Sequence, residues 1–361
     1  MTIWNDQDAV PAFASGLSQP RRPRKAEVSR RRVPSMRRRL KWSGLIFAAT
    51  TLGAIQAFAE PCQPKDRPLA AGYRIGTYSV PSIDMNPASS VVVLEPETDE
   101  PVSGRPLLVL LHGLGGTGCD WVRLGQVDAT LAAMPDTGAR PIVVMPSLGN
   151  NWYVDAGPGR DAEAAFDAII DWVDAKWRID ERPRANSILG LSMGGYGALR
   201  LAMARPRFGS IAALSPAIWQ NVPQEDLNLP AEKLNLIRDA VYFDVEPDGM
   251  FETGIDLPNP GPHFSGAFGD PFDGRRFNAL NVFTLLNDKT RPETMPRLLL
   301  AIGDHDSLGL WRGTFALYQT LKARNVAVHL RVAEGDHNWK FWRSALPDAL
   351  AFLAVGDPPL R

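Results

Sequence analysis

The eighteen residues from 187 to 204, SILGLSMGGYGALRLAMA, decide how this chain folds. An apolar run leads into the pattern Gly-x-Ser-x-Gly at 190–194, with Ser192 at its centre, and an Ala- and Leu-rich run follows. The pattern predicts a buried strand, a sharp turn and a helix, with the serine exposed on the turn as a nucleophile. Glycines at 190 and 194 suit such a turn, because strand and helix backbones approach each other too closely there for a Cβ atom.

Outward from this stretch, apolar runs and amphipathic segments alternate along the chain. Leu107–Leu111 and Ile142–Met145 are apolar at every position, as expected of parallel strands covered on both faces. Asp161–Trp177 has apolar residues at helical spacing and aspartates on its other side. Further strands are expected at Tyr73–Val80, Ser90–Leu94, Ser187–Leu191, Ile211–Leu214, Leu298–Ile302 and Val326–Val332, and further helices at Met193–Ala204, Leu310–Ala323 and Asn338–Leu353. The alternation predicts an α/β fold with a mostly parallel central sheet and helices on both faces.

Residues 218–296 interrupt this alternation. They are rich in Pro, Gly, Asp and Asn and have a weak apolar pattern. We expect an insertion that passes over one edge of the sheet; long loops of this kind are usually either functional lids or disordered, and the sequence leaves both open. Because no linker divides residues 60–361, we predict that they form a single catalytic domain containing this insertion.

A nucleophilic serine needs a neighbouring base, and the chain offers five histidines. On a strand–turn–helix scaffold of this kind the order along the chain is serine, acid, histidine. His337 alone stands on a turn after the last expected strand and before the last expected helix, so we predict that it is the base.

The acid is expected on the loop after the strand Leu298–Ile302, where two aspartates compete. Asp306 stands further round this loop and can turn towards His337, so we favour it as the residue that orients the histidine. Asp304 is the alternative acid; nearer the strand, it is suited to bonding backbone N–H groups of the loop.

Acyl transfer also needs N–H donors aimed at the developing oxyanion. One is predicted to be the backbone N–H of Met193, which follows the nucleophile at a helix N-terminus. The other is expected on the glycine-rich loop 112–116 after the first buried strand, where we choose the N–H of Leu114.

The stretch from Gly190 to Leu199 resembles the nucleophile turn of the putative-esterase superfamily, which includes esterase D, feruloyl and acetyl-xylan esterases, enterochelin esterases and mycobacterial mycolyltransferases. Further pieces agree in order: residues 112–114, 151–155 and 267–270, Gly303-x-x-Asp306, and Gly335-x-His337-x-Trp339. The resemblance spans nearly all of residues 70–355. It implies the α/β-hydrolase fold, the catalytic set Ser192, Asp306 and His337, and backbone oxyanion donors at Leu114 and Met193.

The charge of the chain is divided between two unlike parts. Residues 1–59 hold 11 Lys and Arg against three acids, whereas residues 60–361 hold 28 against 37. Basic residues at 37–41 precede an uncharged apolar run, residues 42–59, that ends Ala-Phe-Ala, so residues 36–59 are predicted to be a signal peptide. Left uncleaved, 42–59 would attach the protein to a membrane. Residues 1–35 have no apolar periodicity, which predicts a disordered basic tail or an untranslated extension.

Charge and residue spacing indicate which partners and cofactors the protein takes. The basic residues belong to the leader, which argues against nucleic-acid binding. No His/Cys cluster has metal-ligand spacing, and no cofactor or metal is expected. Cys62 and Cys119 would both be exported, and the sequence leaves open whether they form a disulfide.

The chain has ten tryptophans, and several aromatic residues fall near the expected site. Trp152, Tyr153, Trp339 and Trp342 lie on loops or helix starts, where their rings could contact substrate. The alternative for Trp339 and Trp342 is that they pack the last helix onto the sheet.

We therefore expect an exported, periplasmic or secreted, serine esterase that hydrolyses a small-molecule, carbohydrate or lipid ester through an acyl-enzyme. The alternative is an acyltransferase that moves the acyl group to a sugar or lipid hydroxyl. A third hypothesis is an inactive binding module on the same scaffold, against which the intact Ser, Asp, His order argues.

Overall fold

The computed structural model describes residues 62–80, 90–98, 103–135, 140–228, 264, 266–289 and 294–354, all within one compact unit. The segments 1–35 and 36–59 lie outside these residues. Within the described ranges, no helix combines the length and apolarity that a membrane crossing requires.

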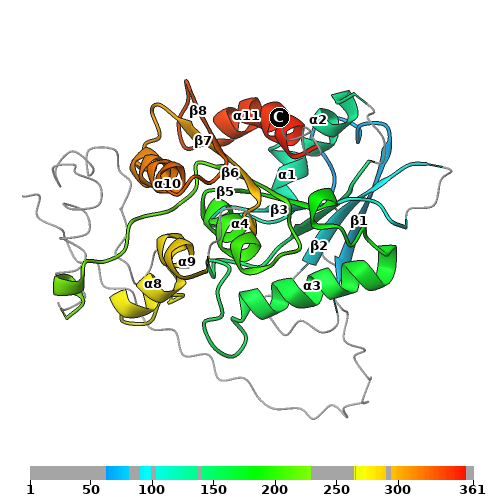
Figure 1. The fold of residues 1–361 in the computed structure, drawn as a ribbon. Coiled ribbons are helices and arrows are strands. Elements are labelled where there is room, and N and C mark those ends of the chain that lie inside the picture. The colour runs from blue at the N-terminus through cyan, green and yellow to red at the C-terminus, as the bar shows by residue number, and fades with distance from the viewer. Residues whose placement is uncertain are drawn as a thin grey trace, which may run out of the picture. The chain divides into compact units, whose positions relative to one another are not determined.

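A twisted sheet of eight strands runs through the described part of the chain, in the order β1-β2-β4-β3-β5-β6-β7-β8 (Figure 1). The strands are β1 (Tyr73–Ser79), β2 (Ser90–Pro96), β3 (Leu107–Leu111), β4 (Ile142–Pro146), β5 (Ser187–Leu191), β6 (Ser210–Leu214), β7 (Arg297–Gly303) and β8 (Val328–Ala333). β1 and β2 pair antiparallel, and so do β2 and β4, whereas the pairs from β4 through β3 to β8 are all parallel. The predicted mostly parallel sheet is confirmed.

Helices cover both faces of this sheet. They are α1 (Asp120–Arg123), α2 (Val127–Ala133), α3 (Ala162–Trp177), α4 (Met193–Ala204), α8 (Gly274–Leu280), α9 (Val282–Lys289), α10 (Trp311–Ala323) and α11 (Trp339–Ala354). The four long helices expected from the sequence are present, with bounds shifted by at most one residue from those predicted.

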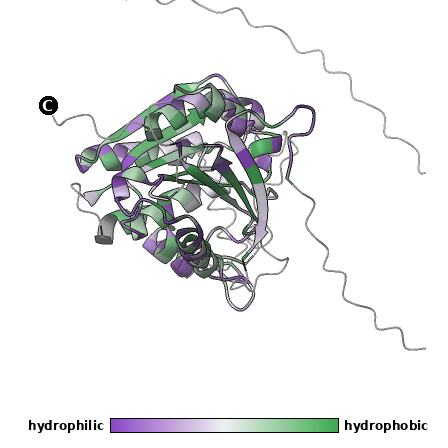
Figure 2. Ribbon diagram, turned by 90° about the vertical axis from the view of Figure 1, so that its right-hand side faces the viewer, coloured by the Kyte–Doolittle hydropathy of each residue, from purple (hydrophilic) through white to green (hydrophobic). Residues whose placement is uncertain are grey.

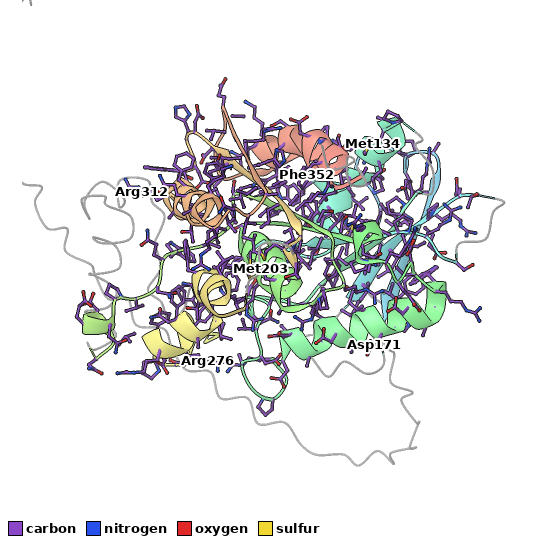
Figure 3. All side chains as sticks on the ribbon, viewed as in Figure 1. Met134, Asp171, Met203, Arg276, Arg312 and Phe352 are labelled. Atoms are coloured by element: carbon purple, nitrogen blue, oxygen red, sulfur yellow. A yellow bond between two sulfur atoms is a disulfide. The ribbon has the colours of Figure 1, made fainter. Side chains whose placement is uncertain are left out.

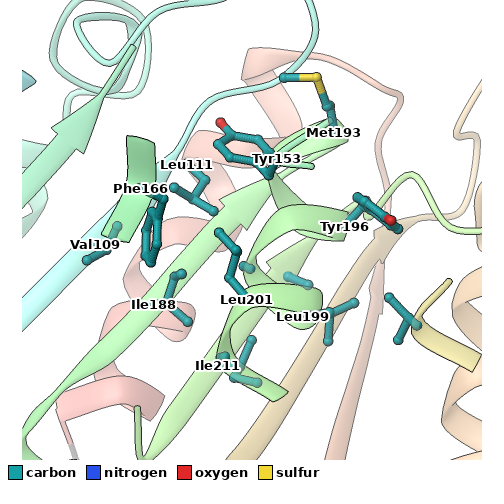
Figure 4. Close-up of a cluster of buried hydrophobic side chains, with 14 of the residues drawn as sticks. Val109, Leu111, Tyr153, Phe166, Ile188, Met193, Tyr196, Leu199, Leu201 and Ile211 are labelled. Carbon is teal, nitrogen blue, oxygen red and sulfur yellow. The ribbon is translucent and has the colours of Figure 1, made fainter. Parts of the chain in front are cut away.

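Alternation along each strand divides the core into two layers. Val109 and Leu111 of β3 pack in one cluster with α3, α4 and α10, and Leu108 and Leu110 pack in the other with α1, α2 and α11. Figure 4 shows the first cluster, in which Phe166 of α3 lies near Val109 and Ile188. Because both faces are covered, the central strands are the most hydrophobic part of the fold (Figure 2).

Part of the predicted insertion 218–296 is helical, since α8 and α9 lie within it. Tyr196 on α4 donates its hydroxyl to the carbonyl of Leu280, which joins the insertion to the helix that follows the nucleophile (2.7 Å). Arg276 of α8, labelled in Figure 3, donates to the carbonyls of Ala267 and Asp155. Residues 229–263 lie outside the described ranges, so the two alternatives for the insertion, a lid or a disordered loop, are not tested there.

Two links fasten the first described residues to the body of the domain. Cys62 and Cys119 form a disulfide, which answers the question that the sequence left open. Arg67 forms a two-point ion pair with Asp128, whose side chain is fully buried on α2. The backbone N–H of Ala70 also donates to this carboxylate, at 3.0 Å.

Candidate active site

Ser192 stands on the turn between β5 and α4 in a strained backbone conformation, with φ 54° and ψ −121°. A Cβ atom at Gly190 would lie 1.9 Å from the carbonyl oxygen of Gly194, and one at Gly194 would lie 2.2 Å from that of Leu111. The two glycines are therefore required by close backbone contacts. The turn holds the serine at the carboxyl edge of the sheet.

The serine belongs to a chain of three hydrogen-bonded side chains. Ser192 Oγ lies 2.9 Å from His337 Nε2, and His337 Nδ1 lies 2.9 Å from Asp306 Oδ2. The residues come from loops that follow β5, β8 and β7, which meet at one edge because these strands are parallel. The His337 side chain is 10% exposed, that of Asp306 is fully buried and Ser192 is also buried, so all three are largely shielded from bulk water.

The two candidate acids have different surroundings. Asp306 Oδ2 faces His337, and its Oδ1 accepts the backbone N–H groups of Leu308 (3.2 Å) and Leu310 (3.4 Å). Asp304 is exposed, and its Oδ1 contacts His305 Nδ1 (2.6 Å) and accepts the N–H of Gly335 (3.0 Å). Hydrogen bonding to His305 and to Gly335 lowers the pKa of Asp304. The geometry thus favours Asp306 as the partner of the histidine and leaves Asp304 to stabilise the loop.

The predicted oxyanion donors flank the serine. Met193 is the first residue of α4, and the first N–H groups of a helix have no acceptor within it. Leu114 lies on the loop after β3 and is 40% exposed. A Cβ atom at neighbouring Gly113 would lie 3.3 Å from the Ser192 Cβ, so this loop passes directly against the nucleophile.

A pocket of about 270 Å³ opens over Ser192 and His337. Its walls are mostly apolar, and Asp120 is the only acidic side chain among the described residues that line it. The lining includes the tryptophans 152, 219, 339 and 342, together with Leu114, Ala217, Leu308 and Leu310. No basic side chain other than His337 is among these described lining residues.

Of the four aromatic residues predicted to contact substrate, three line this pocket and the fourth, Tyr153, does not. Trp152 and Tyr153 both have positive φ (57° and 54°), and this tight turn sends only the tryptophan into the pocket. The Tyr153 ring is fully buried, with its hydroxyl bonded to the carbonyl of His112 at 2.9 Å. The expectation that Tyr153 contacts substrate is therefore corrected.

Trp339 and Trp342 line the pocket and also pack the start of the last helix against its neighbours. Both line the pocket, and Trp339 also packs edge-on against buried Trp121 (5.6 Å between ring centroids). Trp342 stands edge-on to His337 at 5.1 Å and donates its indole N–H to Ser215 Oγ at 3.3 Å. The last helix therefore packs through the same rings that shape the site.

A larger cavity, about 700 Å³, lies at the opposite edge of the sheet, where β3 and β5 begin. Its described lining is apolar and arginine-rich, with no His, Cys, Asp or Glu side chain. Because it offers no base beside a nucleophile, the chemistry belongs to the smaller pocket at the carboxyl edge.

Residues 82–353 match the model of the esterase family described as "Putative esterase". The chain belongs to this esterase family. An acetyl esterase from Caldicellulosiruptor saccharolyticus is 27% identical over 251 residues, which cover 68% of this chain and 82% of that protein.

Solved structures show that this esterase has the α/β-hydrolase fold. A ferulic acid esterase aligns with a TM-score of 0.58 at 20% identity, covering 78% of this chain and 97% of that one. An S-formylglutathione hydrolase from Staphylococcus aureus aligns with a TM-score of 0.55 at 21% identity, covering 78% and 98%. At these identities the likeness concerns the fold.

Sequence reasoning missed several residues of the esterase pocket. Trp219 and Ala217 follow β6, and their place at the carboxyl end of a parallel strand was the available signal. Asp120 begins α1, a helix of four residues that is too short for a periodicity argument. Among the described residues, no group of His, Cys, Asp and Glu side chains could hold a metal ion.

Proposed function

We propose that this esterase is a serine hydrolase that cleaves a carboxylic ester through an acyl-enzyme. The observation that carries the proposal is the chain from Ser192 Oγ to His337 and Asp306, with both contacts at 2.9 Å. A serine, a base in contact with it and a carboxylate behind the base are what nucleophilic acyl transfer requires.

In the first step the Ser192 oxygen attacks the ester carbonyl carbon while His337 Nε2 takes the serine proton. The carbonyl oxygen becomes an oxyanion between the N–H groups of Met193 and Leu114. The C–O bond to the alcohol then breaks, and His337 returns the proton to the leaving oxygen. In the second step a water molecule attacks the acyl carbon while His337 Nε2 takes its proton; the bond to Ser192 Oγ then breaks, His337 returns the proton to the serine oxygen, and the acid is released. Asp306 keeps the proton on His337 Nδ1 at the start of the cycle and stabilises the imidazolium that forms.

The pocket supports a neutral ester as the substrate class. Its tryptophans provide flat apolar walls for an acyl group or for the carbon face of a sugar. Asp120 repels a nearby negative charge, and among the described lining residues no Lys or Arg offsets it. A volume of about 270 Å³ suits a small or flat acyl group.

We also propose that the enzyme is exported. The support is the leader-like segment 36–59 and the disulfide between Cys62 and Cys119, since disulfides persist in oxidising compartments. Mass spectrometry of the protein recovered from cell fractions tests this. A mature N-terminus close to residue 60 in the exported fraction is expected, and an intact leader on a cytoplasmic protein would contradict export.

Turnover of p-nitrophenyl acetate by the wild type and Ser192→Ala tests the enzymatic proposal. We expect hydrolysis by the wild type only, and faster hydrolysis of phenyl acetate than of the anionic analogue 4-acetoxybenzoate. Product analysis with and without a sugar acceptor separates hydrolysis from acyl transfer. Equal turnover by the Ser192→Ala variant would refute the mechanism.

A further inference from the structure

The loop after β4, residues 147–153, is bonded to the loop that carries the Leu114 N–H. The backbone N–H of Leu148 contacts His112 Nε2 at 3.2 Å, and Tyr153 donates its hydroxyl to the carbonyl of His112 at 2.9 Å. Asn150 Oδ1 accepts the N–H of Gly115 at 2.7 Å. Fully buried His112 receives two of these contacts, although nothing in the proposed mechanism uses it.

His112 in turn holds the peptide group that supplies the proposed oxyanion donor. Its Nδ1 lies 2.8 Å from the carbonyl oxygen of Gly113, which also accepts the N–H of Gly116 at 3.0 Å. This carbonyl and the N–H of Leu114 belong to the same peptide unit. In a trans peptide the C=O and the N–H point in opposite directions within one plane, so fixing the carbonyl fixes the N–H. A hydrogen bond to the carbonyl also polarises the amide and strengthens its N–H as a donor.

The contacts specify which tautomer of His112 is present. A backbone N–H can only donate, so the contact with Leu148 requires an unprotonated Nε2. The proton of the neutral ring must then be on Nδ1, which is the atom that has to donate to Gly113. Burial lowers the pKa of His112, which is consistent with a neutral ring.

We propose that His112, held as the neutral Nδ1-protonated tautomer by the Leu148 N–H and fixed at its backbone carbonyl by Tyr153, is a positioning residue that orients the Leu114 N–H towards the oxyanion. The inference rests on the proposed serine mechanism and adds to it a hydrogen-bonded side chain, His112, that fixes the direction of the Leu114 N–H. Because the oxyanion exists only after the serine has attacked the ester carbonyl, loss of the His112 hydrogen bond to Gly113 lowers kcat and leaves KM nearly unchanged.

Two variants of similar size separate the donor role of His112 from its packing. The His112→Asn amide nitrogen reaches the place of Nδ1 and can donate to Gly113. The His112→Gln amide reaches the place of Nε2, so it can accept from Leu148 but leaves Gly113 without the donor. We expect His112→Gln to lower kcat for p-nitrophenyl acetate about 10- to 100-fold, below the ~10²–10³-fold cost of deleting an oxyanion donor outright. His112→Asn should stay within about fivefold of the wild type, and Tyr153→Phe should lie between the two.

Circular dichroism and thermal unfolding of each variant show whether it folds. If wild-type enzyme is active and folded His112→Gln has wild-type kcat, or if the two variants lose kcat equally, the inference is overturned. An inactive wild type would instead refute the proposed function. Nitrogen-15 NMR of the wild-type histidines decides the matter if the variants do not fold. A His112 ring protonated on Nδ1 and bare on Nε2 supports the inference, and the opposite tautomer overturns it.

Discussion

Replacing Asp306 by Asn should inactivate the enzyme by inverting the tautomer of His337. Asp306 Oδ1 accepts two backbone N–H groups, those of Leu308 and Leu310, so an asparagine must keep its carbonyl oxygen there. Its NH₂ group then occupies the place of Oδ2 and faces His337 Nδ1 at about the same 2.9 Å. Two donors cannot bond, so the ring loses its proton at Nδ1 and carries it on Nε2. The nitrogen that faces Ser192 can then no longer accept the serine proton.

The structure indicates a large effect. Wrong-tautomer substitutions in Ser-His-Asp hydrolases lower kcat about 10⁴-fold, which is roughly 5.5 kcal/mol of transition-state stabilisation. Because the carboxylate of Asp306 is fully buried, bulk solvent cannot take over the role of its charge, so we expect a loss of this size.

Asp304→Asn is the matched control, two residues away on the same loop. Its carboxylate is exposed and contacts His305 and Gly335 but not His337, so kcat/KM should change by less than about threefold. Initial rates with p-nitrophenyl acetate across pH 6–9 measure both variants. A larger loss in Asp304→Asn, or more than a tenth of wild-type activity in Asp306→Asn, would refute the assignment of the acid.

Three further predictions concern stability. Gly190→Ala should prevent correct folding or lower the free energy of unfolding by more than about 3 kcal/mol, because the new Cβ atom would lie 1.9 Å from a backbone oxygen. The yield of folded protein and the denaturant midpoint measure this effect, and a wild-type midpoint would contradict the prediction. Replacing Cys62 and Cys119 by Ser should lower the free energy of unfolding by about 4 kcal/mol, because the disulfide closes a loop with a sequence separation of 57. Urea unfolding under oxidising conditions measures this loss, and an unchanged free energy of unfolding would argue against the disulfide. Burial raises the pKa of Asp128, but hydrogen bonds from Arg67 and the backbone outweigh this and lower it below 3.8. Stabilisation by this charge is therefore complete above the unfolded pKa and lost as pH falls through the lower folded value. Urea unfolding from pH 7 to 2 should show a shallower acid dependence for Asp128→Asn than for wild type, and parallel curves would be evidence against the ion pair.

The central strands could be predicted closely because burial on both faces makes the whole segment apolar. Leu107–Leu111 and Ser187–Leu191 match the observed β3 and β5 at both ends. The edge strand β8 begins at Val328 rather than Val326, because half of an edge strand faces solvent and its apolar pattern is weaker.

The helices α8 and α9 were not predicted, because they have only seven and eight residues and α8 packs against residues outside the helix. Phe277 of α8 packs among Phe264, Phe268 and Phe272, with ring centroids 5.1 to 6.0 Å away. In the sequence these phenylalanines recur every four or five residues, but the Gly, Pro and Asp residues between them disfavour a helix, so the segment does not predict one.

At the site, residues on turns after strands were predictable, and side-chain direction was not. Topology alone brings Ser192, Asp306 and His337 to one edge of a parallel sheet. The direction of Tyr153 depends on two successive residues with positive φ, for which neither Trp152 nor Tyr153 gives a sequence signal.

The central claim is that Ser192 is an activated nucleophile, and covalent labelling tests it most directly. The purified protein is treated with a fluorophosphonate and digested with trypsin, and the label is located by mass spectrometry. The expected peptide, residues 185–200, also contains Ser187, whose hydroxyl is buried against Ser210 Oγ at 2.7 Å, so Ser187→Ala is the matched control. We predict one label on Ser192, retained in Ser187→Ala and absent from Ser192→Ala. A label that persists in Ser192→Ala, or a folded wild type that takes up none, would contradict the account.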